Sequence, residues 1–249
     1  DTDFLSAITR TGFVQNHHVA FSGGTDASNY RASVGFMDHN TVVRPQENDN
    51  FIAKLDLQQR AFNNHLRIDL GVFGSSQKNH YIFDNSTASQ IDHPVALLDM
   101  QEHERALNFN THMRLTFDLW RQLQLTLFGS YSFNSTEAQE FLPTYVWAQG
   151  QAYRSEQKSE DWLGNVTLSW KHDYGVHHVE LLGMGEEQSN QRSGFYTTVK
   201  GFNTNAFGYN NLMAGATRPY GGTGSSYERP TLASFMASAK YGLLQRYMF

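Results

Sequence analysis

Apolar and polar residues alternate along about ten separate stretches of this 249-residue chain. In the stretch 29–40, NYRASVGFMDHN, the apolar residues Tyr30, Val34 and Phe36 share one parity, and Arg31 lies on the other. Successive side chains of a β-strand point to opposite faces, so this alternation predicts a strand with one apolar and one polar face. The apolar face would pack on a core in a soluble β-sandwich, whereas it would contact lipid in an outer-membrane barrel.

The same alternation recurs from one end of the chain to the other. It is clearest at 106–120, where Leu107, Phe109 and Leu115 oppose Asn108 and Arg114. The other alternating stretches are 17–24, 51–59, 65–74, 122–134, 161–173, 177–187, 231–242 and a short 246–249. Glycines and short polar breaks between them argue against helices. We therefore expect an all-β chain of antiparallel, up-and-down strands.

The connections between these strands alternate strictly between short and long. Short breaks are expected at 23–28, 61–64, 120–122, 172–176 and 243–245, and long ones at 38–50, 75–105, 135–161 and 188–230. Structureless loops longer than about 15 residues are uncommon in compact soluble domains. Short turns on one side and long loops on the other are typical of transmembrane barrels, whose strands need about 9 to 11 residues to cross the bilayer. We therefore favour the barrel, with strands of about 10 to 14 residues, over the sandwich.

Composition narrows the class further. The net charge is −5, and the chain has no run of lysine or arginine that would form a basic surface for binding nucleic acid. No apolar run approaches the roughly 18 residues of a membrane-spanning helix. The chain has no cysteine, which excludes a disulfide framework and a thiolate metal site. Aromatic residues near the expected strand ends could form interfacial girdles: Tyr30, Phe51, Trp120, Phe133, Trp162, Trp170 and Tyr241.

The start of the chain carries an ordered series of motifs. The residues of this series are Thr2, Asp3, Ile8, Arg10, Thr11, Gly12, Gln15, Asn16, His17, Ser22, Gly23, Gly24, Tyr30, Ala32, Ser33, Gly35 and Asp38. The stretches HPVALLD (93–99), HHVELLGMGEEQS (177–189) and LASFMASAKYGLLQRYMF (232–249) extend it. Together they resemble the barrel of SusC/RagA-type TonB-dependent transporters of Bacteroidetes, with His93 where that family usually has asparagine.

This resemblance implies that the chain, from 1 to 249, is one partial β-barrel region within a longer outer-membrane protein. Residues 1–15 would be a lead-in, and 16–249 would supply strands and loops of a 22-stranded barrel. No TonB box or plug domain is expected in this stretch. The family takes up glycans or peptides, with a SusD-like surface lipoprotein as a lid and energy from the TonB complex acting through the plug. Outer-membrane lipid would be a further partner, and no cofactor is expected.

Aromatic and amide side chains in the expected long loops are the candidates for binding a polar ligand. Aromatic faces stack on sugar or peptide groups while amides supply hydrogen bonds. The candidate ligand-binding residues are Tyr145, Trp147, Tyr196, Phe202, Tyr209 and Tyr220. The alternative for each of them is packing of one loop against another.

Catalytic and metal-binding signals are weak by comparison. Adjacent histidines at 17–18 and 177–178 would point to opposite faces of a strand, so neither pair can chelate one metal alone. An alternative function is a complete ten-stranded outer-membrane protease, whose acid and base candidates would be Asp38, His39, Asp92, His93, Asp99 and His103. We expect the chain not to be an enzyme, because the resemblance accounts for the first forty residues and the protease hypothesis accounts for none of them.

Overall fold

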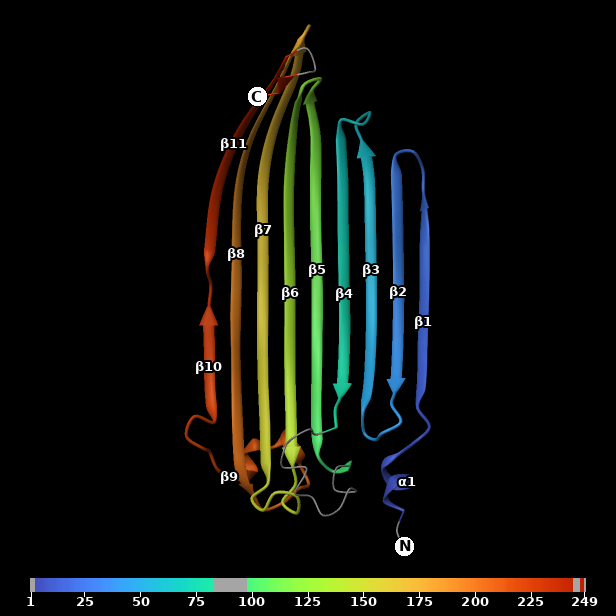
Figure 1. Ribbon diagram of the computed structural model, residues 1–249, viewed down its shortest axis with the longest axis vertical. Helices are drawn as coiled ribbons and strands as arrows, with labels where there is room; N and C mark the ends of the chain where they lie inside the picture. Colours follow the sequence, from blue (N-terminus) through green and yellow to red (C-terminus); the bar gives the residue numbers. More distant parts are fainter. Residues whose placement is uncertain (1–2, 83–97, 244–246, 249) are drawn as a thin grey trace.

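The computed structural model of the chain describes residues 3–82, 98–243 and 247–248. All strands in these residues belong to one antiparallel sheet (Figure 1). The strands are β1 (Phe13–Gly24), β2 (Ser28–Asn40), β3 (Glu47–Ala61), β4 (Leu66–His80), β5 (Gln101–Trp120), β6 (Leu123–Leu142), β7 (Gln151–Tyr174), β8 (His177–Phe202), β9 (Gly215–Thr217), β10 (Thr223–Glu228), β11 (Thr231–Leu243) and β12 (Tyr247–Met248). The helix α1 (Phe4–Ile8) precedes them, and two 3₁₀ turns, η3 (Gly208–Asn210) and η4 (Leu212–Ala214), follow β8.

Strands that follow one another in the chain lie side by side from β1 to β8. The order of neighbouring strands then continues from β8 to β11 and β12. β10 and β9 pair with the C-terminal part of β8, between residues 192 and 202. Within the described part of the chain, this order includes ten strands, and the expected up-and-down, all-β architecture is confirmed. None of the described helices is long and apolar enough to cross a membrane.

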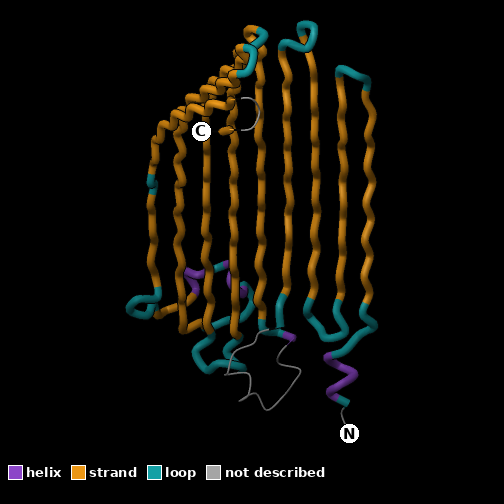
Figure 2. Tube along the Cα trace, turned by 45° about the horizontal axis from the view of Figure 1, so that its top comes forward, coloured by secondary structure: helices purple, strands orange, loops and turns teal. Residues whose placement is uncertain are grey.

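The two ends of the sheet differ in their connections (Figures 1 and 2). At one end, here called the turn end, strands are joined by the short segments 25–27, 62–65, 121–122 and 175–176. At the opposite end, here called the loop end, lie α1, the segments 41–46 and 143–150, and the segment 203–222 that contains η3, η4 and β9. The expected alternation of short and long connections is therefore confirmed.

The expected strand length of about 10 to 14 residues fits β1, β2 and β11 but is too short for β5 to β8, and the expected loops are too long. The strands grow from 12 residues in β1 to 26 in β8, and the loop expected at 135–161 shrinks to 143–150. Asp38 and His39 lie in β2, Glu186 and Glu187 lie inside β8, and β1 begins at Phe13. Near the loop end the strands carry polar residues on both faces, so the alternation fades although the backbone pairing continues.

One face of the sheet carries an apolar band that no other element of the described residues covers. Val19 pairs with Val34, which pairs with Ala53, and the same face continues across the sheet to Leu127 and Val166. Val166 remains 52% exposed, and the buried apolar residues among those described are Met100, Phe141, Leu142, Ala152, Val199 and Phe202, near the loop end. A single-layer sheet cannot bury such a band by itself, so the band requires an apolar environment outside the chain.

The lead-in is fastened to the β2–β3 connection by one arginine. Arg10 donates through Nη1 to Oε1 of Glu47 over 2.7 Å, and through Nε and Nη2 to the carbonyl oxygens of Thr41 (3.0 Å) and Gln46 (2.8 Å). Gly12 lies against the same connection, where an added Cβ would approach Cγ2 of Val42 to 3.2 Å. The Arg-Thr-Gly motif thus holds the chain at the loop end before β1 begins.

We expect Arg10→Ala in the full-length protein to loosen residues 41–46. Loss of hydrogen bonds to a charged donor costs about 1.5–3 kcal/mol each, so amide hydrogen exchange in this segment should accelerate by at least about tenfold. Arg44→Ala is the matched control, because the Arg44 side chain is exposed. Equal exchange rates in the two variants would contradict the clamping role of Arg10.

Candidate functional site

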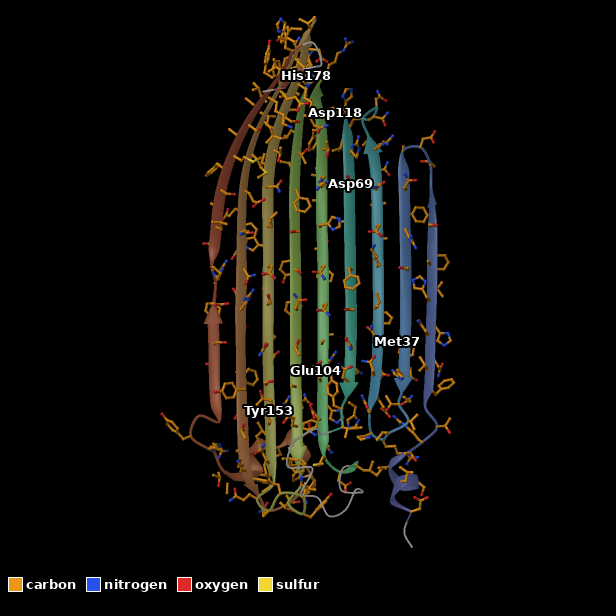
Figure 3. The ribbon with its side chains drawn as sticks, in the orientation of Figure 1. Met37, Asp69, Glu104, Asp118, Tyr153 and His178 are labelled. Atoms are coloured by element: carbon orange, nitrogen blue, oxygen red, sulfur yellow. The ribbon has the colours of Figure 1, made fainter. Side chains whose placement is uncertain are left out.

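A groove of about 800 Å³ lies over β6, β7, β8 and β10 near the loop end. Its lining is polar and aromatic: Asn134, Thr136, Tyr153, Ser155, Gln157, Lys158, Ser159, Arg192, Ser193, Gly194, Phe195, Tyr196, Gly224, Ser225, Ser226, Tyr227 and Glu228. Tyr153, Ser155 and Gln157 share the parity of Asn165 on β7 and so lie on the polar face. Figure 3 places Tyr153 near the loop end.

Strand register brings the groove residues together. Tyr196 of β8 pairs with Ser155 of β7 and with Gly224 of β10. Its hydroxyl donates to the carbonyl oxygen of Gly221 over 3.2 Å, and an added Cβ at Gly224 would approach the Tyr196 ring to 2.7 Å. The absence of a side chain at Gly224 therefore leaves room for the Tyr196 ring on this wall.

The charged residues that line the groove are each paired with an opposite charge, Arg192 with Glu228 inside the groove and Lys158 with Glu156 outside it. Arg192 lies 3.5 Å from Glu228 across the β8–β10 pairing, measured from Nη1 to Oε1. Lys158 lies 2.6 Å from Glu156, measured from Nζ to Oε1. The remaining lining offers hydroxyl, amide and aromatic groups, which suit a polar ligand with faces for stacking.

Of the predicted ligand-binding residues, Tyr196 lies in this groove. Tyr145 and Trp147 lie in the 143–150 connection, where Pro143 O accepts from the backbone N–H groups of Val146 and Trp147. Burial of the Tyr145 hydroxyl and its contact with Asp99 raise its pKa to about 12.

Phe202, Tyr209 and Tyr220 lie apart from the groove. Phe202 is 7% exposed and packs edge-to-face on Phe141, with ring centroids 5.7 Å apart. Tyr209 packs against the same cluster and contacts the His103 ring, while Tyr220 is fully exposed. The structure thus gives Phe202 a packing environment and leaves the Tyr220 side chain free on the surface.

Sequence reasoning missed most of the groove. Gln157 and Arg192 were not singled out, because they lie in the expected loops 135–161 and 188–230, and Asn134 was placed at the end of an alternating stretch without a role in binding. Residues 153–159 are polar at nearly every position, so the apolar and polar alternation that marks the other strands is absent there. Hydrophobic periodicity could therefore not extend the predicted strand toward the loop end.

A second polar cluster joins β3, β4 and β5 near the loop end. Asn79 donates through Nδ2 to the hydroxyl of Tyr81 (2.7 Å) and to Oε1 of Glu104 (3.1 Å), and accepts from Asn48 and from Gln77. Burial, followed by the Glu104 carboxylate, raises the pKa of Tyr81. Asn79 is 7% exposed, so this cluster fastens the strands together rather than facing a ligand.

The protease candidates are not brought together among the described residues. Asp38 and His39 are neighbours in β2, so their side chains point to opposite faces. His103 stacks on His80, with ring centroids 3.9 Å apart. Asp92 and His93 lie outside the described residues. No group of three histidine, cysteine or acidic side chains that could hold a metal ion occurs in the described part of the chain.

Known proteins resemble this chain both in structure and in sequence. No family model matches the chain. Solved structures of outer-membrane import receptors share its fold: the ferric preacinetobactin receptor BauA of Acinetobacter baumannii aligns with a TM-score of 0.59 at 11% identity, over 94% of this chain and 37% of that one. This likeness shows that the chain shares the fold of the corresponding part of that receptor.

The likeness to SusC/RagA-type receptors is stronger. The RagAB peptide importer in its open-open state aligns with a TM-score of 0.76 at 15% identity, over 97% of this chain and 31% of that one. TonB-dependent receptor P3 of Formosa agariphila is 25% identical over all of this chain, and TonB-dependent receptor SusC of Bacteroides thetaiotaomicron is 25% identical over 84% of it. The chain spans 28% and 20% of the lengths of these two relatives. The resemblance to SusC/RagA-type TonB-dependent transporters, and with it the bacterial outer-membrane location, is confirmed.

Proposed function

We propose that this chain forms part of the wall of a TonB-dependent outer-membrane receptor that imports a polar nutrient, a glycan or a peptide. The observation that carries the proposal is the division of the sheet into an uncovered apolar face and a polar face that bears the groove. Lipid would contact the apolar face, and the ligand would pass along the polar face. The relatives, named as receptors and importers, favour transport over catalysis.

The open edges of the sheet support a larger barrel. β1 pairs with β2 alone among the described residues, and an unpaired strand edge is not tolerated in hydrocarbon. We infer that further strands of the full-length protein close the sheet into a 22-stranded barrel, within which residues 1–249 form one continuous wall region.

The partners follow from the same proposal. A SusD-like surface lipoprotein would cover the loop end, where Tyr145, Trp147 and Tyr220 are exposed and available to a ligand or to the lid. The TonB complex would act through a plug region of the full-length protein. Phe202 and Tyr209 would stabilise the packing at the loop end and so influence ligand binding without contacting the ligand.

Uptake by the full-length receptor tests this function. Tyr153→Ala combined with Tyr196→Ala should reduce TonB-dependent accumulation of fluorescein-labelled oligosaccharides or casein peptides by about tenfold, because two stacking surfaces worth about 0.5–1.5 kcal/mol each are lost. Tyr174→Ala at the turn end, outside the groove, is the control and should import normally. Equal accumulation in cells with and without TonB would rule the function out.

A further inference from the structure

Two neighbouring oxygens on the polar face have no hydrogen-bond partner among the described residues. They are Oδ1 of Asp161 in β7 and Oδ1 of Asn190 in β8, and both atoms are shielded from solvent. Asp161 and Asn190 are direct cross-strand partners, so their side chains leave the same face about 4.5–5.5 Å apart at Cβ. One of the two oxygens belongs to a carboxylate and the other to an amide, so both are hydrogen-bond acceptors.

This acceptor pair adjoins the groove. Ser159 and Arg192, which line the groove, are cross-strand partners one pleat nearer the loop end on the same face. Trp162, next to Asp161 on β7, belongs to the apolar face and to the predicted aromatic girdle. The acceptor pair therefore lies at the inner end of the groove, close to the level where the apolar band begins.

Among the described residues, no cation forms an ion pair with Asp161. Its Oδ2 accepts a hydrogen bond from the neutral hydroxyl of Ser159 over 3.2 Å. Arg192, on the same face, pairs with Glu228, and Lys158 points to the opposite face, where it pairs with Glu156. A carboxylate with one shielded oxygen unpaired and only a neutral donor on the other is unfavourable, so this acceptor pair is suited to a positively charged donor.

We propose that Asp161 and Asn190 form a subsite for an ammonium or guanidinium group of the imported ligand. An ammonium carries three N–H donors and no acceptor, so it can satisfy both oxygens and balance the carboxylate charge. A neutral hydroxyl could donate to one oxygen but would leave the charge unbalanced. The inference rests on the proposed import function and adds that the ligand is a basic peptide or an amino-sugar oligomer.

Binding to the purified full-length receptor in detergent tests the subsite with four probes. Two are peptides, N-acetyl-trilysine amide and N-acetyl-trialanine amide, and two are sugars, the glucosamine trimer and the N-acetylglucosamine trimer. We expect at least one cationic probe to bind at least tenfold more tightly than its neutral counterpart. Preference within the peptide pair identifies a peptide ligand, and preference within the sugar pair identifies an amino sugar.

Asp161→Asn should remove that preference, because it keeps the shape and deletes the charge. Asp69→Asn, which changes another carboxylate of the polar face nearer the turn end (Figure 3), should keep it. A difference in gel mobility between unheated and heated samples checks that both variants form closed barrels. Equal binding of cationic and neutral probes by the unaltered receptor, or an unchanged preference in Asp161→Asn, would overturn the subsite while TonB-dependent uptake still upholds the import function. Failure of both cationic probes to bind would also overturn it.

Discussion

Leu168→Arg is expected to block assembly of the full-length receptor in the outer membrane. Leu168 lies on the apolar face of β7, is 45% exposed, and pairs with Leu125 and Gly183. Arginine on the lipid-facing side of a barrel costs about 2–4 kcal/mol near the middle of the bilayer. A penalty of that size is a large fraction of the stability of a typical domain. The folded receptor in outer-membrane fractions should fall at least about tenfold.

Thr167→Arg is the matched control for this substitution. Thr167 is the neighbouring residue, so its side chain points to the polar face, where it pairs with Thr126 and Met184. The same charge placed there should leave the receptor level close to normal. If both variants accumulated equally, the assignment of the two faces to lipid and to the barrel interior would be wrong.

Phe202→Ala is expected to detach the segment 203–214 from the loop end. The Phe202 side chain is buried with Phe141, Ala152 and Val199 in the largest cluster of buried apolar residues among those described, and Tyr209 packs against it. Truncating a buried phenylalanine costs about 3–5 kcal/mol. Limited proteolysis of the full-length receptor should then cut within 203–214 at least about tenfold faster than in the unaltered protein.

Phe207→Ala provides the comparison for this loss of packing. Phe207 lies in the same connection but is 54% exposed, so its removal leaves the cluster intact. Its cleavage rate should match that of the unaltered receptor. Equal acceleration in both variants would mean that the segment is held by something other than the Phe141–Phe202 cluster.

The candidate site was predictable only in part. Tyr196 was recognised as a ligand-binding candidate from its aromatic and amide neighbours, and it does line the groove. Phe202 came from the same reasoning, yet it is buried against Phe141. The aromatic and amide residues around a position identify it as a candidate for binding. They do not tell whether its ring is buried or accessible, because burial depends on which strands lie beside it.

What the sequence by itself determined is the alternation that separates the two faces and the order of short and long connections. Both are local properties, because side-chain direction follows from period two and turns follow from nearby glycine and polar residues. Strand length near the loop end was decided only by the tertiary structure. There Gln151–Glu160 and Gln191–Lys200 pair although neither face alternates clearly, since cross-strand hydrogen bonds extend the sheet. The groove and the Asp161–Asn190 pair exist because that register places residues of separate strands side by side.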